Sequence, residues 1–205
     1  NQNNSTKSSE ATEDELMRGF KGTIALDVRD SKSDWDPFVP PKAPEGAPNV
    51  LFILYDDTGL GAWSPYGGGV SMPTMDALAA DGLTFTNWHT TALCSPTRST
   101  LLTGRTHWIN GYANISEGSD GYPGKSARIP KQVTTIAEVL QDNGYATLWL
   151  GKNHNVPEQD VAPGAYRGEW PLNKGWDRFY GFLGGETNQW YPDLVKDNDF
   201  IEQPY

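Results

Sequence analysis

Short apolar runs and polar breaks alternate along most of the chain, and they predict strands. Residues 50–54 (VLFIL) form a continuous apolar run that stops at Asp56 and Asp57. A run of this kind is typical of a strand buried on both faces. Residues 83–88 alternate apolar and polar positions, which predicts a strand with one buried face. The run YATLWL predicts a third strand over residues 145–150.

Helix signals fall between these runs. Pro73 suits the first turn of a helix over residues 74–81, which Gly82 is expected to end in the left-handed conformation. Thr135 and Glu138 have the spacing of a capping box at the start of a second helix. Strands alternating with helices indicate an α/β domain, and chemistry in such domains gathers beyond the carboxyl ends of the strands.

The start of the chain has a different character. Residues 1–19 are polar and contain too little apolar surface to form a core of their own. Five prolines follow within twelve residues, at positions 37, 40, 41, 44 and 48. Because proline fixes φ and lacks a donor, this stretch predicts an extended connector. We therefore divide the chain into an arm with its connector, residues 1–47, and a catalytic domain portion, residues 48–205.

Composition narrows the class of protein. The chain has 205 residues with 37% hydrophobic and 12% aromatic residues, enough for a packed core. A formal net charge of −10 argues against a general nucleic-acid partner, which needs positive charge. The one cysteine, Cys94, excludes an internal disulfide framework. The sequence contains no apolar run near the roughly 20 residues of a membrane span, so none is predicted.

Three groups of residues carry candidate chemistry. Adjacent carboxylates at Asp56 and Asp57 repel each other, and a hard divalent cation is their natural partner. The alternative interpretation is a solvated turn. Pro96 favours a helix that begins just after Cys94, which puts residue 94 at the positive helix end with Arg98 one turn away. That position suits an anionic nucleophile or an anionic substrate, although a lone cysteine is more often a small buried side chain.

Lys152 and His154 lie two residues apart, just past the predicted third strand. They point to the same side if the backbone stays extended, where a cation and an imidazole would stabilise anionic charge and move a proton. The alternative is a loop tip in solvent. Two other histidines are weaker candidates: a structural hydrogen bond is expected for His89 and a helix-end or surface position for His107. A loop containing Glu186, Asn188 and Trp190 is a further candidate for substrate contact.

The sequence at this point resembles a known family. Residues 94–104 (CSPTRSTLLTG) look like the first sulfatase motif, and residues 144–154 (GYATLWLGKNH) resemble the second. The acidic pair Asp56-Asp57 after the first predicted strand also matches this family in order and spacing. The resemblance covers about residues 48–205 and is closest in style to large bacterial arylsulfatases. It implies part of an alkaline-phosphatase-like α/β fold, a mixed, largely parallel sheet flanked by helices.

The resemblance also implies an activity and its cofactor. Type I sulfatases hydrolyse sulfate monoesters with a Cα-formylglycine, made from the motif cysteine by a formylglycine-generating enzyme, and Cys94 matches that cysteine. The hydrated aldehyde is the nucleophile: one oxygen attacks sulfur and the other later expels sulfate. Asp56, Asp57 and the modified residue 94 match ligands of one Ca²⁺ ion. Arg98 matches the residue that orients the diol.

Two further roles follow from the second motif. Lys152 matches the lysine that bridges residue 94 and a sulfate oxygen, and His154 matches the histidine that takes the proton of the non-attacking hydroxyl. Sulfatases add a further histidine, a further lysine and an Asp-Asn metal pair from later in the chain, and none is assignable here. We therefore expect the front part of a larger enzyme, or one chain of a divided one, that needs the C-terminal remainder.

Two alternatives stay open. The Cys-x-Pro-x-Arg motif also occurs in phosphonate and phosphate ester hydrolases of the same superfamily. The other alternative is a non-catalytic fragment or subunit that needs the missing C-terminal part. The substrate is expected to be a small-molecule or glycan sulfate ester. The polar start resembles a processed, exported chain, which predicts a periplasmic or extracellular location.

Overall fold

The computed structural model describes residues 20–35 and 42–204. Its contacts divide the chain into two units, residues 1–43 and 44–205, and each is described by itself. The predicted polar arm and part of the proline-rich connector lie outside the described residues. The domain boundary after residue 47 therefore stays a prediction.

The first unit contains a small turn structure. An isolated antiparallel bridge joins Thr23 to Lys32 through two backbone hydrogen bonds. Between them lies the 3-10 helix η1 (Val28–Asp30), and the side chain of Asp27 caps it by accepting a hydrogen bond from the amide of Arg29. Backbone pairing and one cap therefore hold this turn, since none of its described residues is buried.

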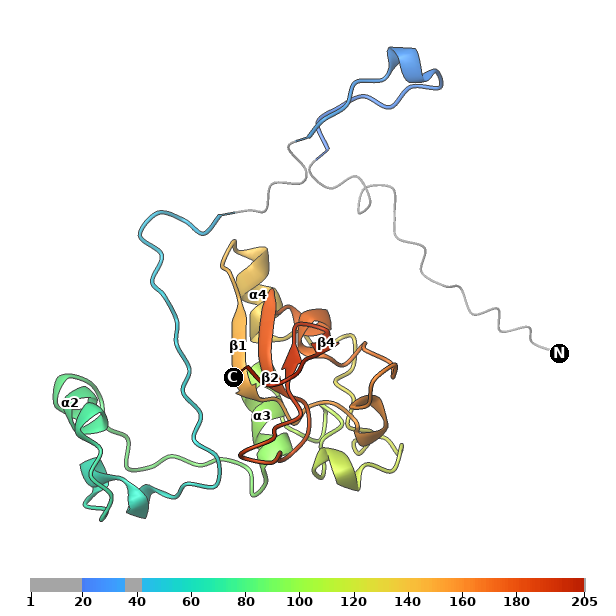
Figure 1. Ribbon diagram of the computed structural model, residues 1–205. Coiled ribbons are helices and arrows are strands. Elements are labelled where there is room, and N and C mark those ends of the chain that lie inside the picture. The colour runs from blue at the N-terminus through green and yellow to red at the C-terminus, as the bar shows by residue number, and fades with distance from the viewer. Residues whose placement is uncertain (1–19, 36–41, 205) are drawn as a thin grey trace. The chain divides into compact units, whose positions relative to one another are not determined.

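A four-stranded sheet in the order β1-β2-β3-β4 forms the centre of the second unit (Figure 1). The strands are β1 (Leu148–Lys152), β2 (Arg178–Phe182), β3 (Val195–Lys196) and β4 (Asp199–Phe200). β1 and β2 are parallel over their whole length, whereas β2–β3 and β3–β4 are short antiparallel pairs. The sheet is therefore mixed, as predicted, and its longest pairing is the parallel one.

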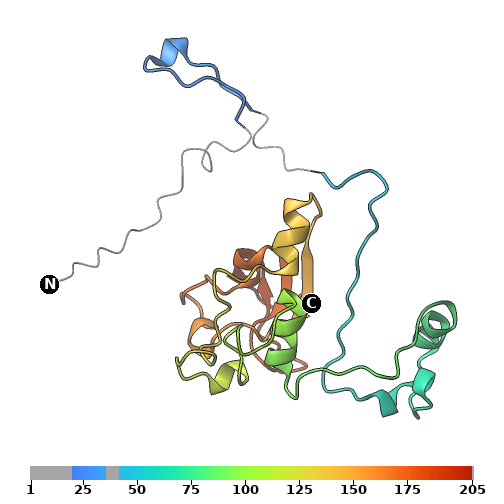
Figure 2. The same ribbon diagram turned by 180° about the vertical axis from the view of Figure 1, so that it is seen from behind.

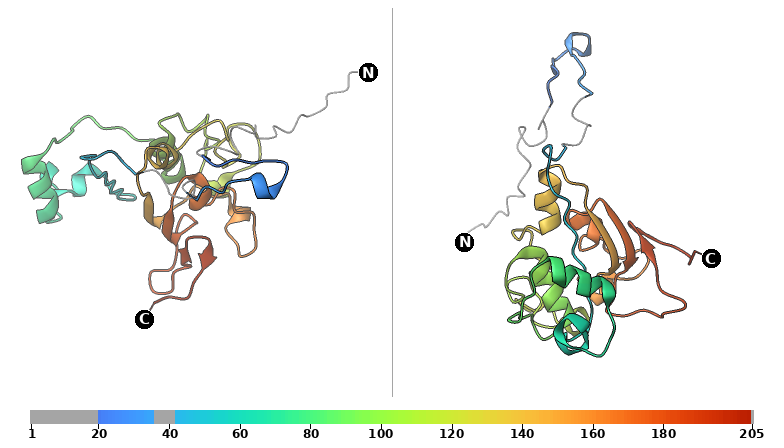
Figure 3. Two further views of the ribbon diagram at one scale, coloured as in Figure 1. Left: turned by 90° about the horizontal axis from the view of Figure 1, so that it is seen from above. Right: turned by 90° about the vertical axis from the view of Figure 1, so that its left-hand side faces the viewer.

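The α-helices of this unit are α2 (Pro73–Asp81), α3 (Cys94–Thr103) and α4 (Ile136–Asp142). Views from behind and from the side show α3 and α4 on one face of the sheet (Figures 2 and 3). α3 ends at Gly104, whose φ of 65° is the left-handed conformation that glycine adopts without strain. α4 begins with the predicted capping box, in which Thr135 and Glu138 satisfy each other's backbone amides.

Short 3-10 helices connect these elements: η3 (Leu60–Ala62), η4 (Ser64–Tyr66), η5 (Ser116–Gly118), η6 (Glu158–Asp160) and η7 (Pro171–Lys174). Two clusters of buried side chains hold the unit together. The first packs on the sheet and contains Val156, Trp170, Phe179, Leu183 and Val195, and the second contains Tyr112, Ala127, Ile129 and Val133. Burying one side chain of the size of Phe179 contributes about 1.5–3 kcal/mol.

Two predicted strands are wrong. Residues 50–54 and 83–88, all described, form no strand, and Leu51 and Leu83 are 82% and 87% exposed. An apolar pattern marks a segment that is suited to burial, but a strand also needs a hydrogen-bonding neighbour, and these segments pair with none of the described strands. Gly82 is also not left-handed, because its φ is −120°.

The strand predicted over residues 145–150 is displaced toward the C-terminus, because β1 starts at Leu148. Thr147 explains the later start. Its amide and hydroxyl bind the side chain of Asp177, and the hydroxyl also donates to the carbonyl of Gly175. These side-chain hydrogen bonds anchor Thr147 at the edge of the ladder, where its carbonyl accepts a hydrogen bond from the amide of Arg178. No helix among the described residues has the length and apolar character needed to cross a membrane.

Candidate active site

Helix α3 places residue 94 at its positive end. Cys94 is the first residue of the helix, one position earlier than predicted, and its side chain is half-buried with a free thiol. The preceding residue, Leu93, provides no side-chain cap. The amides of the first turn and the helix dipole therefore favour negative charge at this end.

Three predicted site residues meet at one carboxylate. The ammonium of Lys152 lies 2.5 Å from Asp56 Oδ2, and Arg98 Nη2 lies 3.2 Å from the same oxygen. Arg98 Nη1 also donates a hydrogen bond of 2.9 Å to the backbone carbonyl of Lys152. These contacts join α3, the end of β1 and the acidic segment that contains Asp56. Arg98 lies 42 positions from Asp56 and 54 positions from Lys152 in the sequence.

Burial and the neighbouring charges together shift the pKa values of this cluster. Burial by itself would raise the pKa of Asp56, but the hydrogen bond from Lys152 and the charges of Lys152 and Arg98 outweigh it, so the pKa of Asp56 is lowered. Burial lowers the pKa of Arg98, against the opposing charges of Asp56, Cys94 and Asp57. The carboxylate is therefore ionised at neutral pH and surrounded by cationic groups.

A hollow of about 200 Å³, which we call the first hollow, opens beside the start of α3. Residues 54–58 and 90–94 line it together with Thr97 and Arg98. The three predicted metal ligands, Asp56, Asp57 and Cys94, all lie in its wall. Within residues 20–35 and 42–204, however, no three His, Cys, Asp or Glu side chains gather closely enough to hold a metal ion.

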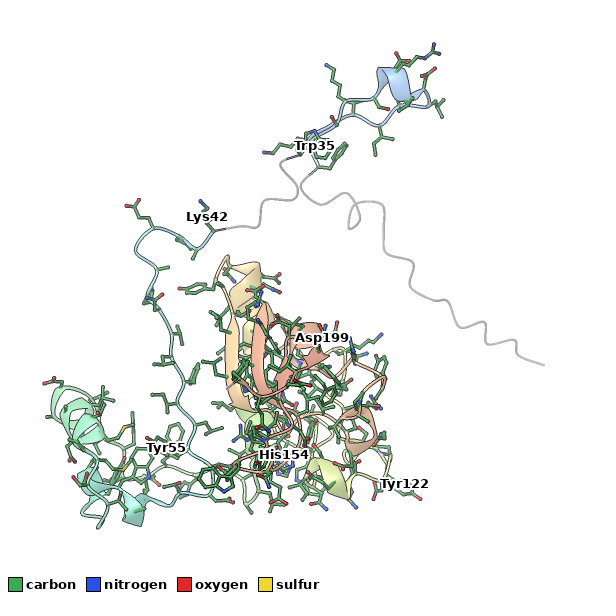
Figure 4. The ribbon with its side chains drawn as sticks, viewed as in Figure 1. Trp35, Lys42, Tyr55, Tyr122, His154 and Asp199 are labelled. Carbon is green, nitrogen blue, oxygen red and sulfur yellow. The ribbon has the colours of Figure 1, made fainter. Side chains whose placement is uncertain are left out.

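His154 pairs with a residue that the sequence did not suggest. Its Nε2 lies 3.0 Å and 2.8 Å from the two carboxylate oxygens of Glu117, which belongs to η5. Only 3% of His154 is exposed, within the packed body of the unit (Figure 4). No sequence pattern distinguishes Glu117 from other surface acids, because the contact spans 37 positions and depends on the fold.

The backbone at His154 departs from the expected extended form. Its φ is 56°, in the left-handed region that non-glycine residues rarely adopt. The extended backbone on which the predicted same-side placement depended is therefore absent at His154, and Lys152 contacts Asp56 whereas His154 contacts Glu117. Burial is the main cause that lowers the pKa of His154, opposed by Glu117 and reinforced by the charges of Lys152 and Arg98.

Glu117 also lines a larger hollow of about 520 Å³, the second hollow. Its wall includes residues 182–187, together with Glu117, Glu158, Val161, Pro163, Asp193 and Phe200. Burial by itself would raise the pKa of Glu117, but the hydrogen bond from His154 and several weaker interactions lower it. The Glu117 carboxylate is therefore ionised and open to solvent on one side, while its other side binds the buried imidazole.

The remaining candidates lie outside this cluster. His89 is exposed and its Nε2 lies 2.8 Å from Asn87 Oδ1. His107 is partly buried, and its Nδ1 makes a structural contact of 2.9 Å with the carbonyl of Tyr112. In the loop after β2, Glu186 lines the second hollow, whereas Asn188 accepts hydrogen bonds from the amides of Trp190 and Tyr191.

Comparison with known proteins finds sulfatase relatives of this chain. The chain is 34% identical to an arylsulfatase of Klebsiella aerogenes over 71% of its length, and 38% identical to human arylsulfatase D over 71%. A solved structure described in work on the metabolism of multiple glycosaminoglycans by Bacteroides thetaiotaomicron matches with a TM-score of 0.54 and 30% identity, over 71% of this chain and 30% of that one.

The match covers only part of each relative: the chain spans 30% of the Klebsiella protein and 25% of the human one. The family model described as Sulfatase matches residues 48–202, which include both motifs, the acidic pair and Glu117. That range is about three quarters of the chain. On the strength of this match and of the relatives, the chain belongs to the sulfatase family.

Proposed function

We propose that this chain supplies the nucleophile side of an active site that hydrolyses sulfuric esters, in the manner of an arylsulfatase. The observation that carries the proposal is the junction of α3, β1 and the acidic segment, where Arg98 and Lys152 flank Asp56 beside Cys94. Cationic side chains and a helix start at one point provide the field that an anionic sulfate group needs. The net charge of −10 does not oppose this, because the local field acts on the substrate.

The nucleophile in this proposal is residue 94 after conversion of the cysteine to Cα-formylglycine. The hydrated aldehyde supplies the oxygen that attacks sulfur. Arg98, held by its hydrogen bond to the carbonyl of Lys152, orients residue 94 from the same helix. Lys152 offers its ammonium to a sulfate oxygen, and His154 accepts a proton as the neutral base that its lowered pKa favours.

The side chains that line the first hollow have the chemistry of ligands for a hard divalent ion, although they are not gathered as a metal site among the described residues. Asp56, Asp57 and residue 94 would hold a Ca²⁺ ion, with carboxylate oxygens as the ligands that calcium prefers. Asp56 pairs with Arg98 and Lys152 in this structure, so an ion bound there would share the carboxylate with these two cations. When bound, the ion would lower the pKa of a coordinated hydroxyl and help to neutralise sulfate. Calcium rather than magnesium rests on the family resemblance.

Because the chain spans 30% or less of the relatives named above, we propose this activity for the protein that carries the whole sulfatase domain. Further residues would supply the leaving-group acid and the rest of the metal shell. A sulfate ester substrate, a formylglycine-generating enzyme during maturation and a periplasmic or extracellular location belong to the same proposal.

The test combines mass analysis with kinetics on the protein from its native source. The peptide that contains residue 94 is expected to have lost sulfur and to carry an aldehyde, and a Cys94→Ala variant is expected to lose aryl sulfate hydrolysis. An unmodified Cys94 in an active preparation would contradict the mechanism. Faster hydrolysis of phosphate diesters or phosphonates than of aryl sulfates would favour the related ester hydrolases instead.

A further inference from the structure

We propose that Glu117 is the positioning residue of His154: its carboxylate holds the Nε2 proton, so that Nδ1 is the nitrogen left free to act as the base. The catalytic consequence rests on the proposed sulfatase function, whereas the pairing itself is a property of this fold. Nothing in the two sulfatase motifs, residues 94–104 and 144–154, includes Glu117.

The contact distances fix the tautomer. Both oxygens of Glu117 lie within hydrogen-bonding distance of His154 Nε2, at 3.0 Å and 2.8 Å. An ionised carboxylate only accepts hydrogen bonds, so Nε2 must carry the hydrogen. In a neutral ring Nδ1 then has the lone pair, and it is the nitrogen that can accept a proton.

His154 Nδ1 is buried and has no hydrogen-bond partner among the described residues. An unsatisfied buried polar atom costs about 1–3 kcal/mol, so the arrangement keeps a base available at a cost in stability. The left-handed backbone of His154 adds to that cost, because this conformation is strained for a residue with a side chain. Residues strained in this way cluster at functional sites. Both features indicate a ring held in place for chemistry.

Neighbouring groups restrain the pair. The hydroxyl of Ser116 donates to the carbonyl of His154 at 3.1 Å, and the amide of Ser116 donates to the hydroxyl of Ser95 at 3.2 Å. This second bond ties η5 to the residue that follows Cys94. At Gly185, a side-chain carbon would lie 2.7 Å from the His154 ring and 2.9 Å from Glu117 Oε1. Position 185 therefore has room for nothing larger than glycine, while Glu117 stays open to the second hollow.

The charges around the ring give Glu117 a second effect. Lys152 and Arg98 disfavour a protonated imidazole, whereas Glu117 favours it. If Nδ1 were to take a proton from a hydroxyl of the converted residue 94, the ring would become an imidazolium with both nitrogens protonated. The adjacent carboxylate offsets that charge and stays ionised, in the way that a buried aspartate supports the histidine of a serine-protease triad.

The second hollow makes this inference testable by chemical rescue. The Glu117 side chain is 38% exposed and lines that hollow, so a Glu117→Ala variant would leave space that is open to solvent next to Nε2. Formate or acetate has the same acceptor oxygens as the lost side chain. Either ion can enter the hollow and accept the Nε2 hydrogen bond in place of Glu117.

The first experiment compares variants of the full-length protein in hydrolysis of 4-nitrophenyl sulfate. Glu117→Ala is expected to lower kcat on the order of 10²-fold, and formate is expected to restore part of it saturably. Glu117→Gln keeps the shape but not the charge, so it is expected to lose activity while it remains folded. The matched control is Glu158→Ala, in the same hollow without a contact to His154, which is expected to show neither the loss nor the rescue.

The second experiment does not depend on activity. Nitrogen NMR of the three histidines is expected to show that His154 is protonated at Nε2 and bare at Nδ1, and that Glu117→Ala abolishes this preference. A His154 protonated at Nδ1 in the unaltered protein, or a Glu117→Ala variant with unchanged kcat, overturns the inference. If NMR confirms the tautomer and the protein hydrolyses no sulfate ester, the proposed function has failed and the pairing has not.

Discussion

Gly185 is packed directly against the His154–Glu117 pair. A side-chain carbon at this position would come within 2.7 Å of His154 Nε2, closer than real contacts allow. Its neighbour Gly184 differs, because a carbon there would meet only the carbonyl of Glu186, at an ordinary distance of 3.7 Å. Glycine is therefore required at position 185 for steric reasons, whereas position 184 has room for a larger side chain.

We expect Gly185→Ala to displace the imidazole from the carboxylate and to lower kcat roughly 10-fold or more, since small misplacements at a catalytic group are costly. Gly184→Ala is the matched control and is expected to retain nearly full activity. Both are measured as hydrolysis of an aryl sulfate by the full-length protein. Equal activity of the two variants would show that the close packing of Gly185 against the pair is unimportant.

The sequence predicted individual site residues unevenly. Arg98, Lys152 and Asp56 lie in or beside motifs with fixed spacing, and the structure brings these three together. Their chemical roles stay predictions. Glu117 has no such pattern and becomes visible only when η5 folds against the segment after β1. Spacing along the sequence predicts contacts between residues within one helical turn or at one strand end. It does not predict a contact such as His154–Glu117, which forms between two segments that are distant in the sequence.

At the scale of elements, the start of α4 is an anchor between the helix and the loop before β2. The Thr135 hydroxyl accepts a hydrogen bond from the Glu138 amide at 3.2 Å and donates one of 2.7 Å to the carbonyl of Lys174. The Glu138 carboxylate in turn accepts from the amide of Thr135. The cap therefore both begins the helix and fixes it to η7.

We expect Thr135→Ala to lower the free energy of unfolding by about 1–2 kcal/mol, because both hydroxyl hydrogen bonds are lost. Thr135→Ser, which keeps the hydroxyl, is expected to recover most of it. Thr134→Ala changes the preceding exposed threonine and serves as the control. Urea denaturation followed by circular dichroism measures all three. A loss as large for Thr134→Ala would contradict the assignment.

Asp177 connects three elements. Its carboxylate accepts hydrogen bonds from the amide and hydroxyl of Thr147, before β1, and from Gln141 in α4. Burial by itself would raise the pKa of Asp177, but the hydrogen bonds from Thr147 and Gln141 outweigh it and lower the pKa. A lowered pKa in the folded protein means that the ionised carboxylate stabilises the fold above the unfolded-state pKa, and that this contribution disappears as the pH falls.

We therefore expect Asp177→Asn to destabilise the protein by about 1 kcal/mol at neutral pH. The difference is expected to shrink once the pH falls below about 4, where the unfolded chain's aspartates are protonated. Unfolding in urea at the two pH values measures it, and Asp142→Asn, at the end of α4 and outside this network, is the control. A difference that does not change with pH would show that shape rather than charge matters.

The helices and strands of the structure show why the sequence predicted only part of the fold. The α4 capping box was predicted because its two residues, Thr135 and Glu138, lie three positions apart. Residues 50–54 have the composition of a strand but pair with none of the described ones, and β2 to β4 were not predicted. Long-range pairing decides whether an apolar run becomes a strand, and the run itself contains no information about its neighbour.

At the scale of the whole molecule, the second unit leaves an unusual amount of apolar surface in contact with solvent. Leu51, Phe52 and Ile53 are 82%, 58% and 61% exposed in one continuous run. Exposed apolar patches of this kind mark surfaces suited to burial against protein. The exposed run immediately precedes Asp56, so its burial would also hold the acidic segment against Arg98 and Lys152.

We expect the 205-residue chain to bind the apolar dye ANS, and Leu51→Asp with Ile53→Asp to reduce the dye fluorescence severalfold. The control is Leu26→Asp, because Leu26 is fully exposed and lies outside this run. Titration of the dye against each purified chain measures the effect. Unchanged binding in the double variant would mean that the run is not an apolar surface in solution.

The position of the one cysteine at the start of α3 has a practical consequence. Under the proposed conversion, a chain carries a thiol before maturation and an aldehyde afterwards, and never both. In denatured protein, the fraction that reacts with a thiol reagent and the fraction that reacts with a hydrazide must therefore add up to the whole population. The two fractions therefore give the yield of the conversion without a separate standard.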